Sequence, residues 1–255
     1  MSLTVFISGA SSGIGASLAA HYSQQGAIVG LVGRDAARLA KVAAALPGAS
    51  AIYVASVTEL AAMQRAAAEF TARFGLPDLV IANAGISAGT ATEDAADFAA
   101  FREVVDTNLS GMVATFQPFV AGMRERGQGT LAGIASVAGF RGLPGAGAYC
   151  ASKAAAISYL ESLRVELRGS GIAVITVAPG FVATPLSSRN PYRMPFLLTA
   201  DDAARRIARA IEAKRSFAVI PWQMAIVGAL LRWLPNFLYD RIFARAPRKP
   251  RRGHA

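Results

Sequence analysis

Residues 3–25 of the chain read LTVFISGASSGIGASLAAHYSQQ, and this stretch gives the strongest indication of the fold. Leu3–Ile7 is an apolar run typical of a buried β-strand, and Ile14–Gln25 has the alanine-rich composition of a helix. Between them, a glycine-rich turn lets the backbone approach a bound group at the amino end of the helix, where free N–H groups attract anions. This order of elements predicts a site for the phosphates of a dinucleotide. The residues expected to form it are Gly9, Ser11, Ser12, Gly13, Ile14 and Gly15.

The same alternation of strand and helix continues along the chain. The further strands are expected at Ile28–Val32, Ala51–Val54, Leu79–Ala82, Thr130–Ala135, Ala173–Val177 and Phe217–Ile220. The further helices are expected at Ala36–Leu46 and Glu59–Phe74, within Asp97–Arg126, and from about Ala148 to Arg168. Nearly all-apolar strands that alternate with helices are typical of a parallel sheet covered on both faces. We therefore predict an α/β fold, a three-layer Rossmann-type doubly wound parallel sheet, with a catalytic domain over residues 1–220 and a C-terminal helical extension over 221–255.

Composition narrows the classes of protein that the chain can belong to. Its 255 residues suffice for one large domain. A single cysteine, Cys150, excludes a disulfide within the chain and favours a reducing compartment. The two histidines, His21 and His254, have no cysteine cluster to join, so we expect no zinc-type metal site. Because we also find no signal peptide and no apolar run long enough to span a membrane, we expect a cytoplasmic protein.

Tyr149 and Lys153 form the pair with the clearest chemistry. Four residues apart in a predicted helix, they share one face. A lysine ammonium beside a phenol favours the phenolate and so lowers the tyrosine pKa. A phenol tuned in this way can give a proton to a carbonyl oxygen or take one from an alcohol. Alone, the pair is also typical of a solvated helix face.

The end of the second predicted strand indicates which dinucleotide is bound. An NAD site usually has an acid here for the ribose 2′-hydroxyl, but this chain has Gly33 followed by Arg34. A guanidinium suits a 2′-phosphate, which favours NADP. Asp35 fits the N-cap of the next helix, which leaves Arg34 free for the phosphate.

Several motifs occur in an order that resembles the single-domain short-chain dehydrogenases/reductases. The resemblance covers about residues 3 to 220. Its motifs are Gly9–Gly15, Asn83-Ala84-Gly85, Asn108, Ser136, Tyr149 with Lys153, and Pro179-Gly180 followed by Thr184. Each motif alone is weak, but together they are specific.

The resemblance implies a role for each of four catalytic residues. Tyr149 would be the general acid or base, and Lys153 would lower its pKa and hydrogen-bond the nicotinamide ribose. Ser136 would orient the substrate oxygen. Asn108 would hold a water that links Lys153 to solvent.

The resemblance also implies the remaining cofactor contacts. Those expected beyond the glycine turn are Arg34, Ser56, Asn83, Ala84, Gly85, Tyr149, Lys153, Pro179, Gly180, Val182 and Thr184. Two positions depart from the family pattern on the adenine side. Ser56 stands where an aspartate is usual, and Ala82 stands where the motif usually begins with asparagine.

The substrate side is apolar in sequence. The segment Leu186–Leu198 corresponds to the substrate loop and contains Tyr192, Met194, Pro195, Phe196 and Leu197, while Phe140, Leu143 and Phe181 lie beside catalytic motifs. We therefore expect an apolar small-molecule substrate. Arg141, Arg189 and Arg193 are candidates to hold a substrate anion, although none is obviously placed to do so.

The chain continues past the last predicted strand with two apolar helical patterns, Trp222–Leu234 and Asn236–Arg245. Seven basic residues and one acidic residue follow position 230. Tryptophans beside a basic cluster suit an interfacial helix, so residues 222–255 are candidates for peripheral contact with an anionic inner membrane surface. An oligomer contact or a cover over the substrate pocket are equally open. We expect no nucleic acid as a partner, because no stacking aromatics alternate with the basic end.

The function favoured by the sequence is reduction of a ketone or aldehyde of an apolar small molecule with NADPH. The alternatives are an NAD-linked alcohol dehydrogenase of the same family and a membrane-docked nucleotide-sensing protein with little catalysis. We also expect a homo-oligomer, a dimer or a tetramer.

Overall fold

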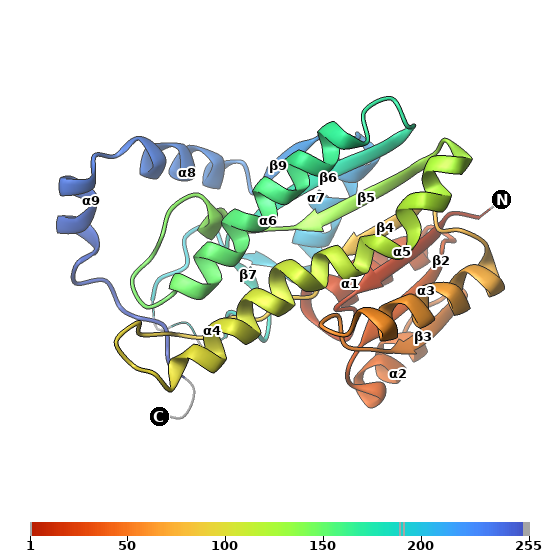
Figure 1. The fold of residues 1–255 in the computed structure, drawn as a ribbon, viewed down its shortest axis with the longest axis horizontal. Helices are drawn as coiled ribbons and strands as arrows, with labels where there is room; N and C mark the ends of the chain where they lie inside the picture. The colour runs from red at the N-terminus through yellow and green to blue at the C-terminus, as the bar shows by residue number, and fades with distance from the viewer. Residues whose placement is uncertain (1, 189, 191, 252–255) are drawn as a thin grey trace.

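A parallel sheet of seven strands forms the middle layer of the protein, in the order β3-β2-β1-β4-β5-β6-β9 (Figure 1). The computed structural model describes residues 2–188, 190 and 192–251. The strands are β1 Thr4–Ser8, β2 Ile28–Gly33, β3 Ser50–Val54, β4 Leu79–Ala82, β5 Gly129–Ile134, β6 Ile172–Pro179 and β9 Phe217–Ile220. All seven predicted strands are therefore confirmed, five of them with an end shifted by one or two residues.

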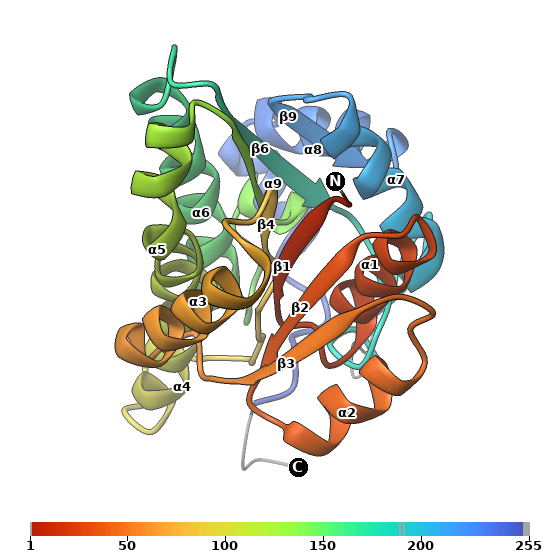
Figure 2. The same ribbon diagram turned by 90° about the vertical axis from the view of Figure 1, so that its right-hand side faces the viewer.

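Helices cover both faces of the sheet, as Figure 2 shows. On one face lie α3 Leu60–Phe74, α5 Gly111–Arg126 and α6 Gly147–Glu166, and on the other α1 Gly13–Gln24, α2 Ala36–Ala44 and α7 Ala200–Glu212. Each face has its own core, with Phe70 and Phe116 buried in the first and Leu18 and Ile207 in the second. The predicted three-layer doubly wound fold is confirmed.

The winding of the chain reverses at β1, and this reversal positions the site. β1 pairs with β2 on one side and with β4 on the other, so the connections leave the sheet in opposite directions. At such a point the carboxyl ends of neighbouring strands open a crevice in which ligands bind.

The predicted long helix within Asp97–Arg126 contains a break in regularity. α4 Asp97–Val105 passes into a π-helical turn over Asp106–Ser110 before α5 begins. A π turn accommodates an extra residue in the helix, and such turns occur often at functional sites. Here the turn contains Asn108, which is fully buried.

Three local elements were not predicted from the sequence. They are the helix α7, a 3₁₀ turn over Val137–Gly139, and the short pair β7 Val182–Ala183 with β8 Leu198–Thr199. The sequence does contain a signal for α7, because Thr199 is its N-cap and accepts a hydrogen bond from the Asp202 N–H at 3.1 Å.

The C-terminal extension forms α8 Gln223–Trp233 and α9 Asn236–Phe243 and then a segment over residues 244–251, called here the C-terminal strap. After α9 the strap turns back toward the loop before α4, a path that can be followed in Figure 1. It ends in a β-bridge between Gly89 and Arg251. Two basic residues of the strap, Lys249 and Arg251, are therefore packed against the rest of the protein.

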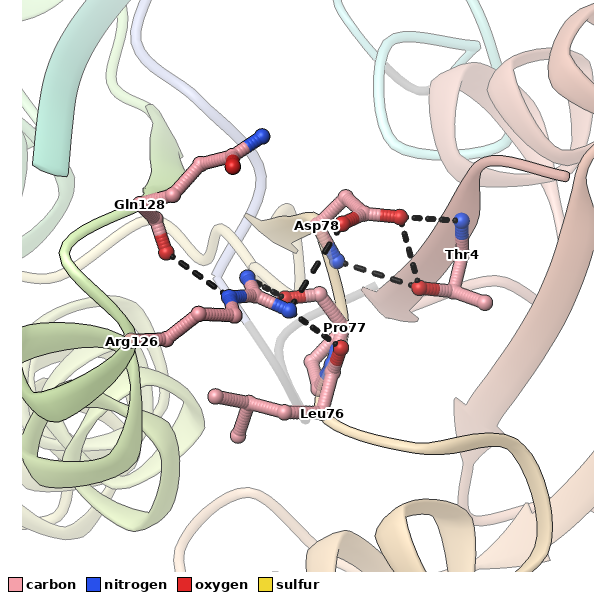
Figure 3. A network of polar contacts seen from close by, with 6 residues as sticks. All are labelled: Thr4, Leu76, Pro77, Asp78, Arg126 and Gln128. Atoms are coloured by element: carbon pink, nitrogen blue, oxygen red, sulfur yellow. Dashed lines mark hydrogen bonds and ion pairs between the residues drawn. The ribbon is translucent and has the colours of Figure 1, made fainter. Parts of the chain in front are cut away.

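A polar network joins the amino ends of the central strands, at the edge opposite the crevice (Figure 3). Asp78 accepts hydrogen bonds from the N–H and hydroxyl of Thr4, both at 2.9 Å. Arg126 lies 3.6 Å from the other Asp78 oxygen and donates to the carbonyls of Leu76, Pro77 and Gln128. These contacts fasten the end of α5 to β1 and to the start of β4.

Candidate active site

A cavity of about 770 Å³ runs along the carboxyl ends of the strands. The residues predicted to bind the cofactor or to act in catalysis line it, except Gly15 and Asn108. Gly15 lies beneath the turn, where a β-carbon would overlap the Gly9 carbonyl. Asn108 is fully buried and does not reach the surface of the cavity. Both are placed to support the lining rather than to form it.

The glycine turn is held in a shape that only glycine allows. Gly9 and Gly13 have φ of +70° and +54°, in the left-handed region. A β-carbon on Gly9 would lie 2.7 Å from the Ala84 Cα, and one on Gly13 would lie 3.0 Å from the Thr184 side chain. The turn therefore presents bare backbone to the cavity, which fits the pyrophosphate of a dinucleotide.

Asn83 has a structural task in addition to lining the cavity. Its Nδ2 donates to the carbonyl of Ser8 at 3.3 Å and to that of Gly9 at 3.1 Å. The amide therefore braces the glycine turn from the end of β4. Sequence analysis placed Asn83 in the site but did not foresee this bond, because no local pattern relates residues 74 positions apart.

Two arginines reach the end of the cavity beside β2. Arg34 is exposed and lines the cavity, and Arg38 on α2 lines it as well. Asp35 is the N-cap of α2, since its Oδ1 accepts from the Arg38 N–H at 3.0 Å. Arg38 was missed, although its place one turn after Arg34 could have indicated it.

Ser136 and Tyr149 meet at the centre of the cavity. Ser136 is buried at the end of β5, where its Oγ accepts from the Ala138 N–H at 3.1 Å. Removal from water raises the pKa of Tyr149 to about 12, although a hydrogen bond with Ser136 opposes this rise. The Tyr149 phenol is therefore protonated at neutral pH.

Lys153 faces the same centre from the next turn of α6. It is buried, its Nζ donates to the Ile134 carbonyl at 2.8 Å, and Nζ lies 5.9 Å from the centre of the Tyr149 ring. Burial lowers the pKa of Lys153 to about 8. The predicted lowering of the Tyr149 pKa by Lys153 is therefore not observed in the protein by itself: burial dominates, and the ammonium is directed to a backbone carbonyl.

Asn108 fastens the loop after β4 to α6. Its Nδ2 donates to the Ile86 carbonyl at 3.0 Å and to the Ser152 hydroxyl at 2.9 Å, and its Oδ1 accepts from the Ile86 N–H at 2.8 Å. A β-carbon on Gly85 would lie 3.3 Å from that Oδ1 and 3.5 Å from Lys153 Nζ. Asn108 and Lys153 thus both lie close to Gly85. The water-holding role of Asn108 stays a prediction.

The segment after β6 closes the cavity near Ser136. Pro179, Gly180, Val182 and Thr184 line the cavity as predicted. The Ser187 hydroxyl donates to the Val182 carbonyl at 2.6 Å, so the segment is bent back on itself.

Ser56, at the adenine end, lines the cavity and its hydroxyl lies 2.8 Å from that of Thr58.

The substrate end of the cavity is lined mainly by apolar side chains, as predicted. Phe140, Leu143, Phe181 and Tyr192 line it. So do residues of the C-terminal extension that the sequence did not place there, namely Met224, Val227, Gly228, Leu231, Phe243, Ala246, Pro247 and Lys249. Membrane contact, oligomer contact and a cover over the pocket were the three uses considered for the extension. Its lining residues show that it covers the pocket.

The three arginines considered for a substrate anion have different positions. The Arg141 guanidinium donates to the carbonyls of Leu231 and Leu234 at the end of α8 and stacks on the Tyr239 ring at 3.9 Å. It therefore serves to anchor the extension. Arg193 lines the cavity, and Arg189 lies outside the described residues.

A doubly wound sheet, a glycine-turn cradle and a Ser-Tyr-Lys centre in one crevice define an NAD(P)-dependent dehydrogenase. A family model described as short chain dehydrogenase matches residues 3–193. The chain belongs to the short-chain dehydrogenase/reductase family, as the sequence motifs predicted.

Relatives of known sequence agree with this assignment. An uncharacterized oxidoreductase of Myxococcus xanthus (strain DK1622) is 38% identical over 243 residues, which cover 93% of this chain and 94% of that protein. Cis-4-hydroxycyclohexanecarboxylate dehydrogenase of Sinomonas cyclohexanicum is 34% identical over 234 residues, which cover 88% and 92% of the two chains.

Solved structures share the fold. Levodione reductase aligns with a TM-score of 0.78 and 25% identity over 88% of this chain and 98% of that one. The 3-ketoacyl-(acyl-carrier-protein) reductase of Brucella melitensis, complexed with NADH, aligns with a TM-score of 0.78 and 26% identity over 85% and 95%. No helix in the described part of this chain has the length and apolarity needed to cross a membrane.

Proposed function

We propose that the protein reduces a ketone or aldehyde of a largely apolar small molecule, with NADPH as the reductant. The observation that carries this proposal is the meeting of Ser136 and Tyr149 at the centre of a cavity that has a phosphate cradle at one end and a mainly apolar lining at the other. In this proposal residues 1–220 hold the catalytic and cofactor groups, and residues 221–255 complete the substrate side.

The protonation state of Tyr149 favours the reducing direction. A phenol with its pKa raised to about 12 holds its proton at neutral pH and can donate it to a carbonyl oxygen. The Ser136 hydroxyl, beside the Tyr149 phenol, would hold that oxygen in place. Lys153 would hydrogen-bond the nicotinamide ribose, and Asn108 would hold a water that links Lys153 to solvent. When bound, the dinucleotide supplies the hydride.

Substitution of Tyr149 tests the proposed chemistry. Tyr149→Phe removes the proton donor but keeps the ring, so we expect kcat to fall about 10²- to 10⁴-fold while NADPH binding changes little. The measurement is the loss of NADPH absorbance with a panel of cyclic and linear ketones and aldehydes. Full activity in Tyr149→Phe would exclude this phenol as the acid.

The same panel separates the alternatives. A protein that oxidises alcohols with NAD but does not reduce ketones would fit the NAD-linked dehydrogenase. Nucleotide binding without turnover in either direction would fit a nucleotide-sensing protein. The name of the Sinomonas cyclohexanicum relative supports beginning the panel with small alicyclic ketones and alcohols.

The preference for NADPH rests on Arg34, which we propose to contact the 2′-phosphate together with Arg38. Both exposed guanidinium groups line the cavity end beside β2. A charge-assisted hydrogen bond contributes about 1.5–3 kcal/mol. We therefore expect Arg34→Ala to weaken NADPH binding roughly 10- to 100-fold and to leave NADH binding nearly unchanged.

Fluorescence titration of the bound nicotinamide measures both affinities. Arg124→Ala, on the outer side of α5, serves as a control for the loss of one positive charge. Tighter binding of NADH than of NADPH by the unmodified protein would contradict the proposal. The NADH- and NAD-bound reductases among the structural relatives make this comparison necessary.

We further propose a cytoplasmic homo-oligomer, a dimer or tetramer, with peripheral membrane contact through the extension. Exposed Phe98 and Phe101 on α4 support a subunit contact there. The buried free thiol of Cys150 is compatible with a reducing compartment. Light scattering coupled to size-exclusion chromatography measures the oligomeric state, and a monomer would contradict this part of the proposal.

A further inference from the structure

The C-terminal strap brings a positive charge into the substrate end of the cavity. Lys249 lines the cavity, and its Nζ lies 5.6 Å from the centre of the Tyr149 ring. We propose that Lys249 is a specificity-determining residue that binds a carboxylate of the substrate, so that the natural substrate is an apolar oxo- or hydroxycarboxylate. This inference rests on the proposed function, since it names the substrate class of the same site.

The strap holds Lys249 in place by contacts on both sides. The Gly89 N–H donates to the Pro250 carbonyl at 3.0 Å, and a β-carbon on Gly89 would overlap the Lys249 carbonyl. On the preceding side, Arg248 packs closely against Gly145, where a β-carbon would lie 2.9 Å from the Arg248 Cβ. Two glycines therefore make room for the backbone around Lys249.

An ion-pair anchor follows directly after Lys249. Arg251 pairs with Asp94 and, at 2.7 Å from Nε to Oδ2, with Asp97. Asp97 is buried at the start of α4 and also accepts from the Ala91 N–H at 2.7 Å. Pairs with a buried partner are less screened by solvent than pairs on the surface, so this anchor fixes the end of the strap.

The charge balance of the cavity favours an anion at Lys249. No aspartate or glutamate occurs among the cavity-lining residues that the structure describes, and none of the described carboxylates forms an ion pair with Lys249. A partly buried ammonium without a counter-charge is costly, and binding an anion removes that cost. Burial also lowers the pKa of Lys249, which is the effect expected where an ammonium has lost water and gained little in return.

The chemistry around Lys249 indicates which anion fits. A single ammonium balances a single negative charge, as in a carboxylate. The cavity-lining residues that precede Lys249 in the extension, Phe243, Ala246 and Pro247, are apolar. Of the arginines considered for a substrate anion, Arg141 is occupied by the end of α8, whereas Arg193 lines the same cavity as Lys249. A substrate whose carboxylate is held by Lys249 would lie beside Tyr149, because Lys249 Nζ is 5.6 Å from the centre of the Tyr149 ring.

The test is a binding measurement on the full-length protein that needs no turnover. The probes are cyclohexanecarboxylate and the neutral cyclohexanecarboxamide, neither of which has a reducible ketone, and the readout is isothermal titration calorimetry. We expect the carboxylate to bind about 10- to 100-fold more tightly than the amide, the range for a hydrogen bond to a charged group.

Three variants test whether Lys249 is the source of the preference for the carboxylate. Lys249→Met should abolish it, Lys249→Arg should keep most of it, and Arg245→Met should leave it unchanged, because Arg245 is exposed and has the same charge only four residues away. Circular dichroism shows whether each variant is folded. An equal preference in the wild type and Lys249→Met, or none in the wild type, would overturn the inference.

The two proposals can fail separately. If the protein reduces neutral ketones with NADPH but shows no carboxylate preference, the role of Lys249 is wrong and the reductase remains. If the carboxylate preference depends on Lys249 but no ketone or aldehyde is reduced, the reductase proposal is wrong and the anion site remains.

Discussion

Lys153 illustrates how burial, rather than pairing with another charge, controls the pKa values in the candidate active site. Lys153 is 4% exposed, and its ammonium donates to the backbone carbonyl of Ile134. A carbonyl compensates only part of the lost hydration, so the pKa of Lys153 falls to about 8. The same burial raises the pKa of Tyr149, because the charged form of a phenol is the deprotonated one.

This shift predicts a pH dependence of stability. Between the folded pKa of about 8 and the ordinary value of 10.5, the unfolded chain binds more protons at Lys153 than the folded protein does. The free energy of unfolding should therefore rise with pH over this window, by at most about 1.4 kcal/mol per unit from this group. Lys153→Met should lack this contribution.

Urea unfolding of both proteins at pH 7, 8, 9 and 9.5 measures the effect. The difference in stability between wild type and Lys153→Met should change in favour of the wild type as the pH rises. Measurements stay below pH 10 because Tyr149, whose pKa is raised from 10.0 to about 12, then acts in the opposite sense. A difference that does not vary with pH would contradict the predicted Lys153 pKa.

At the scale of elements, the two ends of the strands have different roles. The carboxyl ends of the strands carry the cavity, and the amino ends are joined by the network of Thr4, Asp78 and Arg126 in Figure 3. The π turn over Asp106–Ser110 makes a third contribution, because it directs Asn108 toward Ile86 and Ser152. Stability and chemistry are thus assigned to separate ends of the same strands.

Removal of the Asp78 carboxylate should lower stability without changing the chemistry. Asp78→Ala leaves the partly buried N–H and hydroxyl of Thr4 without their acceptor, which costs about 1–3 kcal/mol. Thermal unfolding should show a lower Tm, while the affinity for NADPH stays the same. Glu161→Ala is the matched control, because Glu161 pairs with Arg164 on the surface and should change stability by less than about 1 kcal/mol. Equal Tm shifts in the two variants would contradict the structural role of the network.

At the scale of the whole molecule, the C-terminal extension has two faces. Its inner face lines the cavity through Met224 and Gly228 and is tied to the body by Arg141 and Tyr239. Its outer face is apolar, with Leu230 67%, Trp233 85% and Phe237 71% exposed. An apolar face of this kind marks a surface that is covered in function.

The proposed partner of this face is an anionic membrane, and exposed arginines near it agree with that proposal. Arg232, Arg241 and Arg245 are exposed on or next to α8 and α9. We expect Leu230→Ser with Trp233→Ser to lose most binding to vesicles that contain phosphatidylglycerol, because each buried apolar side chain contributes about 1.5–3 kcal/mol.

Vesicle co-sedimentation measures this binding, with Val165→Ser, an exposed apolar residue on α6, as the control. Deletion of residue 222 onward is a poor test, since it would also remove the wall of the cavity. Unchanged sedimentation of the double variant would sink the membrane interpretation, and a change in oligomeric state instead would assign the face to a second copy of the chain.

The sequence by itself determined what depends on local periodicity and on short motifs. Apolar strands, alanine-rich helices and the turn at Gly9 and Gly13 each encode their own conformation, so the doubly wound sheet follows from them. The order of the motifs, by its resemblance to a known family, is why Ser136 and Tyr149 could be expected in one site. α7 was missed although Thr199 offered a capping signal.

Only the tertiary structure decided what depends on contacts between distant segments. No local pattern relates Lys249 to Tyr149, Arg141 to the end of α8, or Asn83 to the Gly9 carbonyl. These contacts arise because packing of the extension and of the sheet brings the segments together, and the same packing removes water from Tyr149 and Lys153. Burial therefore set their pKa values, and the path of the chain turned a basic C-terminal segment into part of the cavity wall.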